Sequence, residues 1–155
     1  MKKMLSLLLT VCLLAGALSL TASAAEKQVT IRVHGDDRQI TTVRRLASEI
    51  IYNFCDNAVK YNREGGSVDV TIDGTAHGAV VTVQDTGIGI PPEHQSRVFE
   101  RFYRVDKSHS RQSGGTGLGL SIVKHAVQYL GGRIELESQP GKGTTMRVHF
   151  PDGNV

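Results

Sequence analysis

The stretch GGTGLGLSIVK, from Gly114 to Lys124, sets four glycines around one threonine immediately before an apolar helical run. Glycine has no Cβ, so its backbone can adopt positive φ and approach a ligand closely. A glycine-rich turn that opens a helix directs several N–H groups and the positive end of the helix dipole at an anion. A nucleotide phosphate is the anion we expect, although turns of this composition also serve simply to reverse the chain.

Strands and helices alternate on both sides of this turn. Alternation of apolar and polar residues predicts strands over 28–34, 67–73, 79–84, 133–138 and 144–150. Apolar residues spaced three and four apart predict two long helices and a shorter one, over 38–62, 121–130 and 92–101. A loop is predicted for the polar, basic residues 103–114.

The composition indicates one globular domain behind a short leader. The chain has 155 residues, of which 39% are hydrophobic, enough for one domain with a core. It has 18 basic residues against 15 acidic ones, and two of the basic residues, Lys2 and Lys3, belong to the leader. The rest is nearly neutral, so the charge balance gives no reason to expect nucleic acid as a partner. Cys12 lies in the leader and leaves Cys55 alone, so a disulfide framework is not indicated.

Residues 1–25 read as a targeting segment. A basic start at Lys2-Lys3 precedes an apolar run from Leu5 to Leu20, and Ala22-Ser23-Ala24 fits a small-x-small cleavage pattern. The apolar run is short for a spanning helix, which needs about 20 residues. We expect a signal peptide, with an uncleaved membrane anchor as the alternative.

Asn53, Asn57 and Lys60 share one face of the predicted long helix because they lie three and four residues apart. Magnesium that holds phosphates prefers hard oxygen ligands, and the side-chain oxygen of Asn57 can serve as one. Lys60, one turn further on, could meet a phosphate. The alternative is that both asparagines merely bind backbone or solvent.

Two further features suit a nucleotide. Asp85 ends a predicted strand before a Gly-x-Gly turn, where its carboxylate could accept a hydrogen bond from an amine such as that of adenine. A turn cap is the commoner use of Asp. A basic cluster could clamp a triphosphate or form a solvated surface, and comprises Arg97, Arg101, Arg104, Lys107 and Arg111.

Two other phosphate motifs do not fit. The P-loop needs Gly-x4-Gly-Lys-Ser/Thr, which Gly141-Lys142-Gly143 does not supply. The Rossmann pattern needs a third glycine where Leu120 stands, in the register that starts at Gly115.

Five motifs together resemble those of sensor histidine kinases. In chain order they are the N box, the first glycine box, the phenylalanine box, the second glycine box and the last one, at residues 53–61, 85–91, 98–104, 115–120 and 141–144. The family is the histidine-kinase ATP-binding domain, related to gyrase and heat-shock chaperone ATPases. The resemblance covers about residues 28–151, so we expect a leader over 1–25 and this catalytic domain over 26–155.

The resemblance implies an α+β fold, a two-layer α/β sandwich of the Bergerat type with helices on one face of a mixed sheet. It implies Mg²⁺ on Asn57 and adenine on Asp85 with Thr144, with an ATP lid over about 93–114. The implied catalytic residues are Asn53, Asn57, Lys60 and Arg104. The implied ATP-binding residues are Asn53, Asn57, Lys60, Tyr61, Asp85, Gly87, Gly89, Ile90, Phe102, Gly115, Thr116, Gly117, Leu118, Gly119, Leu120 and Thr144.

Asn53 stands where hydrolysing relatives carry a glutamate that acts as general base for water. An amide cannot usefully accept that proton. The site therefore looks built for phosphoryl transfer, in which positioning and electrostatics carry most of the rate.

The phosphoacceptor is not found in this chain. Such a histidine usually precedes an acidic residue, whereas the six histidines here precede Gly, Gly, Gln, Ser, Ala and Phe, and His125 reads as a helix-surface residue. We therefore expect transfer to a His on a separate dimerisation domain and, through it, to a response regulator. The alternatives are a nucleotide-binding or vestigial fragment without transfer, and a Ser/Thr-directed switch kinase of the same fold.

The leader and the predicted ATP site indicate different cellular locations for the protein. Lys2-Lys3 before the apolar run would place the following residues outside the cytoplasm, where ATP is scarce. The leader predicts a membrane-associated or exported protein, whereas ATP use predicts the cytoplasmic face.

Overall fold

The computed structural model describes residues 28–37, 39–105 and 116–153. Within these ranges, five strands form one sheet in the order β1-β2-β3-β5-β4. The strands are β1 (Val29–Gly35), β2 (Gly66–Thr75), β3 (Gly78–Asp85), β4 (Arg133–Gln139) and β5 (Gly143–Pro151). β1 runs parallel to β2 and the other neighbours are antiparallel, so the sheet is mixed.

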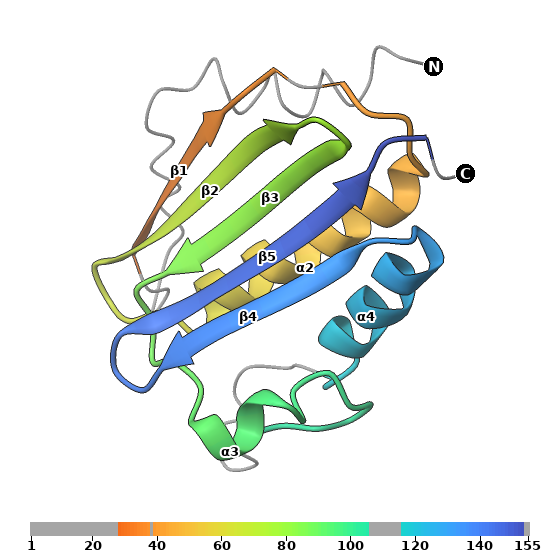
Figure 1. The fold of residues 1–155 in the computed structure, drawn as a ribbon. Helices are drawn as coiled ribbons and strands as arrows, with labels where there is room; N and C mark the ends of the chain where they lie inside the picture. Colours follow the sequence, from red (N-terminus) through yellow and green to blue (C-terminus); the bar gives the residue numbers. More distant parts are fainter. Residues whose placement is uncertain (1–27, 38, 106–115, 154–155) are drawn as a thin grey trace.

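Two long helices, α2 (Arg44–Lys60) and α4 (Gly119–Tyr129), lie side by side across one face of the sheet (Figure 1). Their apolar stripes meet alternate residues of the central strands, as the period of two in a strand requires. Full burial of such a side chain stabilises the fold by about 1.5–3 kcal/mol. The fully buried centre comprises Ile50 and Phe54 of α2, Val123 of α4, Leu130, and Val68, Val83 and Val148 of the sheet. The predicted two-layer sandwich is confirmed.

The start of the long helix was predicted wrongly. The structure begins α2 at Arg44 and not at residue 38. The preceding backbone bonds elsewhere: Asp36 N donates to Ile72 O over 2.7 Å, and Thr41 N donates to Asp152 Oδ1 over 2.9 Å. These contacts tie the segment to β2 and to Asp152 near the C-terminal end of the described residues, and the helix begins only after it, at Arg44.

The short helix α3 (Pro92–Gln95) is also shorter than the predicted 92–101. Beyond it, Glu100 N bonds to Arg97 O three residues back, which gives tight turns in place of α-helical bonds. α4 begins two residues earlier than predicted. Most of the predicted loop 103–114 lies outside the described residues.

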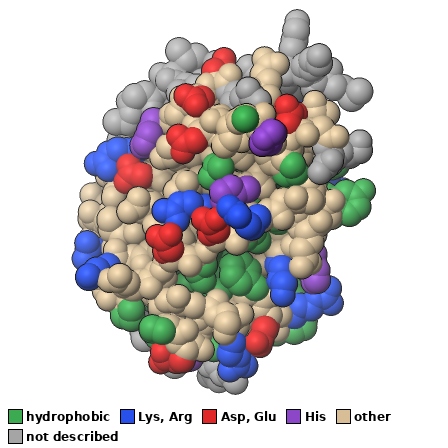
Figure 2. Space-filling view, viewed as in Figure 1, with side chains coloured by type: hydrophobic (Ala, Val, Ile, Leu, Met, Phe, Trp, Pro, Cys, Tyr) green, Lys and Arg blue, Asp and Glu red, His purple; other side chains and the backbone are tan. Residues whose placement is uncertain are grey.

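The other face of the sheet carries no described helix. Basic, acidic and histidine side chains are interspersed over it (Figure 2). Ion pairs join Arg133 to Glu135 along β4 and Arg147 of β5 to Glu137 of β4, each at 2.7 Å. Such exposed pairs contribute about 0–1 kcal/mol each. None of the helices in the described ranges is long and apolar enough to cross a membrane.

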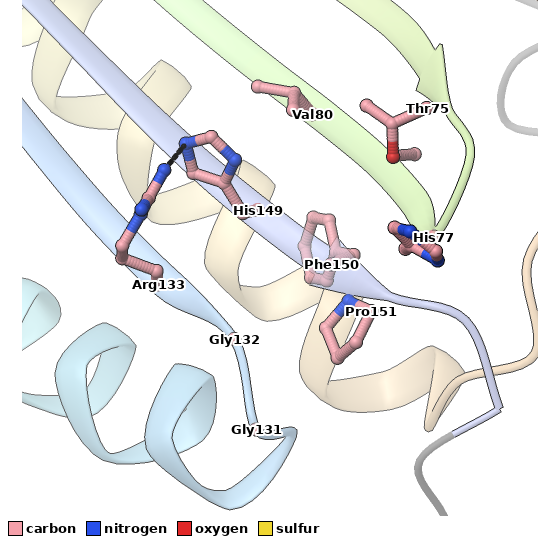
Figure 3. Close-up of a pocket in the computed structure, with 10 residues that line it drawn as sticks. Thr75, His77, Val80, Gly131, Gly132, Arg133, His149, Phe150 and Pro151 are labelled. Carbon is pink, nitrogen blue, oxygen red and sulfur yellow. Dashed lines mark hydrogen bonds between the residues drawn. The ribbon is translucent and has the colours of Figure 1, made fainter.

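A shallow groove of about 280 Å³ opens at one end of the sheet. Figure 3 shows Arg133 and His149 side by side in it, joined by a 3.3 Å hydrogen bond. Val80 lines it near the start of β3, whereas Asp85 ends that strand. The groove therefore lies at the end of the sheet opposite to the sequence motifs.

Candidate functional site

Asp85 is fixed at the end of β3 by two backbone donors. Gly87 N donates to its Oδ1 over 2.8 Å, and Thr144 N donates to the same oxygen over 3.2 Å. Among the described residues, Oδ2 has no hydrogen-bond partner. No buried side-chain oxygen or nitrogen of these residues lacks a partner, so Oδ2 is open to solvent. The carboxylate is thus held rigidly by one oxygen and offers the other to a ligand.

Burial raises the pKa of Asp85 above the usual carboxyl range, and the two backbone donors oppose that rise. Partial burial disfavours the charged form, whereas N–H donors stabilise it. A ligand that donates a hydrogen bond to Oδ2 would favour the ionised form further.

The turn after Asp85 admits glycine alone at two positions. A Cβ on Gly87 would overlap the carbonyl oxygen of Tyr61 and lie 2.8 Å from Asp85 Oδ1. Gly89 has a φ of +70°, and a Cβ there would overlap the carbonyl oxygen of Gln139. Ile88 N also donates to Tyr61 O over 3.0 Å. The turn is therefore packed between the end of α2 and the β4–β5 hairpin.

Ser138 and Gln95 hold this turn, and sequence reasoning missed both. Ile90 N donates to Ser138 Oγ over 2.8 Å, and Ser138 Oγ lies 2.9 Å from Thr144 Oγ1. Gln95 Nε2 donates to Ile90 O and to Ser138 O, each over 2.9 Å. A serine at the end of a strand beside Pro-Gly is a weak signal, because such residues usually serve turns.

Asn53 and Asn57 lie on one face of α2, in the half of the helix that ends beside the Gly87 turn. Asn53 Nδ2 donates to Glu49 O over 2.8 Å, and a Cβ on Gly119 would lie 2.5 Å from Asn53 Oδ1. Asn53 therefore adjoins the first turn of α4. Asn57 is half-buried, and its side chain makes no hydrogen bond to any described residue. Its carboxamide oxygen is available to a cation, as a magnesium ligand must be.

Lys60 and Tyr61 end the same helix. Lys60 Nζ lies 5.6 Å from the centroid of the Tyr61 ring, a cation–π distance, and the Tyr61 side chain is exposed. The backbone carbonyl of Tyr61 contacts the Gly87 turn, so the end of α2 that carries both residues adjoins that turn.

Phe102 and Gly117 meet although 14 residues of sequence separate them, ten of which lie outside the described ranges. Phe102 N donates to Gly117 O over 2.9 Å. Gly117 has a φ of +71°, and Phe102 has a φ of 62°, which is unusual for a bulky residue. Phe102 is 71% exposed. This hydrogen bond therefore joins the two described segments that flank the undescribed part of the predicted lid.

The second glycine box leads from Gly117 into α4. Leu118 is the N-cap of α4 and makes no side-chain cap hydrogen bond. The first N–H groups of α4 are therefore open to an anion. Leu120 packs against the core and Thr116 is exposed. The predicted ligand Gly115 lies outside the described residues.

The described basic residues of the predicted lid gather around a cavity of about 410 Å³, lined by Arg97, Glu100, Arg101, Phe102, Tyr103 and Arg104. Arg97 pairs with Glu100 at 3.3 Å and its guanidinium carbon lies 4.3 Å from the Tyr103 ring centroid. Its charge is thus already engaged. Lys107 and Arg111 fall outside the described residues.

Residues 42–154 match the family described as histidine kinase-, DNA gyrase B-, and HSP90-like ATPases. The chain belongs to this ATPase family. Its predicted resemblance to the ATP-binding catalytic domain of sensor histidine kinases is confirmed.

Curated relatives of this ATPase-family chain are sensor proteins. The phosphate regulon sensor protein PhoR of Pseudomonas aeruginosa is 48% identical over 103 residues, which cover 66% of this chain and 23% of PhoR. Sensor histidine kinase WalK of Bacillus subtilis is 46% identical over 106 residues, 67% of this chain and 17% of WalK. Sensor-like histidine kinase SenX3 of Mycolicibacterium smegmatis is 43% identical over 121 residues, 78% of this chain and 30% of SenX3. The chain therefore spans less than a third of each of these proteins.

Solved structures of this family share the fold. The mycobacterial sensor histidine kinase MprB aligns with a TM-score of 0.68 and 31% identity, over 82% of this chain and 84% of that chain. Full-length ShkA in complex with AMPPNP aligns with a TM-score of 0.66 and 28% identity, over 82% of this chain and 27% of that chain. The mixed sheet with helices on one face is thus the fold of histidine-kinase catalytic domains.

Proposed function

We propose that this chain is the Mg-ATP-binding catalytic domain of a sensor histidine kinase. It transfers the γ-phosphoryl group of ATP to a histidine on a dimerisation domain, which passes it to a response regulator. The observation that carries the proposal is Asp85, fixed through Oδ1 with Oδ2 open, at the same end of the sheet as Asn57. The relatives' identity as sensor kinases, and a related structure solved with AMPPNP, support it.

The base half of the site reads adenine. The exocyclic amine of adenine donates to Asp85 Oδ2, beside Thr144. The side chains of Tyr61 and Ile90 line the base, and the absence of a side chain at Gly87 lets the turn pack against the Tyr61 carbonyl and Asp85 Oδ1. A ligand that presents an acceptor in place of the amine would face a carboxylate and be rejected.

The phosphate half lies on α2, the lid and the start of α4. Asn57 supplies an uncommitted carboxamide oxygen for Mg²⁺, and Lys60 and Arg104 supply positive charge to the phosphates. The uncapped N–H groups of α4 add donors. Magnesium, when bound, neutralises charge on the phosphates during transfer.

Asn53 favours transfer over hydrolysis. Its Nδ2 is engaged with Glu49 O, and an amide has no basic atom to take a proton from water. The chain therefore holds and orients ATP, while the attacking nitrogen comes from a partner histidine.

For the whole chain, we propose a leader over residues 1–25, as signal peptide or anchor, and the catalytic domain over 26–155. ATP use predicts the cytoplasmic face for this domain, whereas the leader predicts membrane association or export.

A second candidate is a nucleotide-holding module without transfer. The absence of an acidic residue after every one of the six histidines favours it, because self-phosphorylation within the chain is then not expected.

Mixing the chain with dimerisation domains of related kinases and γ-labelled ATP tests the proposal. We expect acid-labile label on the partner, abolished by Asn57→Ala and retained by His125→Ala on the exposed surface of α4. ATP binding without label on any partner favours the second candidate. Acid-stable label indicates a Ser/Thr-directed kinase.

A further inference from the structure

A buried polar cluster joins the end of α2 to the turn after β3. Asn62 is 1% exposed, and its Nδ2 donates to Ser67 O over 3.0 Å. Thr86 Oγ1 accepts from Ser67 N over 2.9 Å and lies 3.3 Å from Asn62 Oδ1 as a donor. Thr86 N donates to Ser67 O over 3.1 Å. Arg63 N also donates to Asn62 Oδ1 over 3.0 Å. The side chains of Asn62 and Thr86 and the backbone of Ser67 thus belong to one hydrogen-bonded cluster.

The cluster has no spare room. A Cβ on Gly66 would overlap Asn62 Oδ1 and lie 2.9 Å from Thr86 Oγ1. The side chains therefore cannot shift without moving β2 or the end of α2. Buried hydrogen bonds of this kind fix geometry strongly, because an unmade partner is costly.

The two side chains of the cluster belong to residues that are sequence neighbours of both halves of the proposed site. Asn62 follows Lys60 and Tyr61 directly, and Thr86 stands between Asp85 and Gly87. The adjoining bond from Ile88 N to Tyr61 O, at 3.0 Å, crosses the same junction. A change in the backbone conformation at Thr86 would therefore move the Asp85 carboxylate relative to the helix that carries Asn57.

Building on the proposed ATP site, we propose that Asn62 and Thr86 are positioning residues that set the spacing between the adenine-reading Asp85 and the magnesium-binding face of α2. Neither side chain needs to touch the nucleotide. With the spacing fixed in advance, one ligand engages both halves without an ordering cost. The hydroxyl of Thr86 is the central element, since it accepts from Ser67 N and donates to Asn62.

The test compares Thr86→Val with Thr86→Ser. Valine keeps the shape but removes the hydroxyl, which leaves Ser67 N–H without its acceptor; serine keeps the hydroxyl. Thr82→Val is the matched control, since Thr82 lies on β3 but on the helix-free face, between Thr71 and Arg147. Dissociation constants for Mg-ATP and for AMP are measured by calorimetry, with thermal unfolding in parallel.

We expect Thr86→Val to weaken Mg-ATP binding about tenfold. AMP lacks the β- and γ-phosphates that use α2, so its affinity should fall clearly less. Thr86→Ser should restore most of the affinity, and Thr82→Val should leave it unchanged. The measurement is made well below the melting temperature of each variant, so that loss of folded protein does not lower the affinity.

A lowered melting temperature with unchanged Mg-ATP affinity would show that the cluster only stabilises the fold and would overturn the inference. Equal losses for Mg-ATP and AMP would also overturn it, since the two halves would then not be coupled. Failure of the unaltered chain to bind ATP would instead refute the proposed function, so the two failures are distinguishable.

Discussion

The two halves of the site differ in how firmly their side chains are held. At the base end, Asp85 Oδ1 is fixed by Gly87 N and Thr144 N, and the adjoining turn admits no Cβ at Gly87. At the proposed phosphate end, the Asn57 side chain makes no hydrogen bond to any described residue, and Lys60 Nζ lies over the exposed Tyr61 ring. In the proposed site we expect preorganisation at the base end to give selectivity, and the more loosely held groups at the phosphate end to adapt to phosphates and a cation.

Of the substitutions considered, Asp85→Asn at the base end should lower ATP affinity the most. The variant loses the charge that we propose accepts from the adenine amine, and we expect about a hundredfold weaker ATP binding in calorimetry. The fold should remain as stable or become more stable, because burial penalises the charged carboxylate. Asp73→Asn, at an exposed position on β2, is the control. An Asp85→Asn variant that binds ATP normally would exclude this role.

Asn57→Ala should remove the proposed Mg²⁺ ligand at the phosphate end of the site. We expect the gain in ATP affinity on adding Mg²⁺ to shrink by about tenfold, while binding without Mg²⁺ changes little. Asp56→Ala, at the exposed neighbouring position of α2, should keep the gain. An unchanged Mg²⁺ dependence in Asn57→Ala would place the cation elsewhere.

Ser138→Ala should make the turn after β3, at the base end of the site, slightly less rigid. It removes the acceptor for Ile90 N and the contact with Thr144 Oγ1, bonds of about 1 kcal/mol each. ATP affinity should fall about threefold to tenfold. If Ser138→Ala binds as well as the unaltered chain, Gln95 alone suffices to hold the turn.

The stability of the base end should depend on pH through Asp85. Its pKa is raised in the folded state by burial, so the folded chain binds this proton more tightly than the unfolded chain. The contribution of Asp85 to the free energy of unfolding therefore rises as pH falls through its folded pKa, and is complete below the unfolded value of about 3.9. Urea unfolding of the unaltered chain and Asp85→Asn between about pH 3.5 and pH 7 measures it. The free energy of unfolding of the unaltered chain, minus that of Asp85→Asn, should increase on acidification, and a decrease would contradict the raised pKa.

The predictability of the fold from sequence differs along the chain for physical reasons. Strand alternation and the apolar spacing of α4 are local signals, and they located the sheet and that helix. The start of α2 depends on contacts of Asp36 and Thr41 with residues distant in sequence, which no local pattern reveals.

The site shows the same division. Asp85, Gly87 and Asn57 were predicted because their motifs are short and ordered, and the structure brings them to one end of the sheet. Their roles toward ATP stay predictions. Ser138, Gln95 and the Asn62–Thr86 cluster were missed, since each acts on backbone groups that become neighbours only in the fold.

The most direct test of the account is one calorimetric comparison of Mg-ATP with Mg-GTP on the unaltered chain. Guanine presents a carbonyl oxygen where adenine presents its amine, so it would set an acceptor against Asp85. The account predicts that ATP binds and that GTP binds at least about a hundredfold more weakly. Equal affinity for the two nucleotides would contradict the claim that Asp85, held through Oδ1, reads the base.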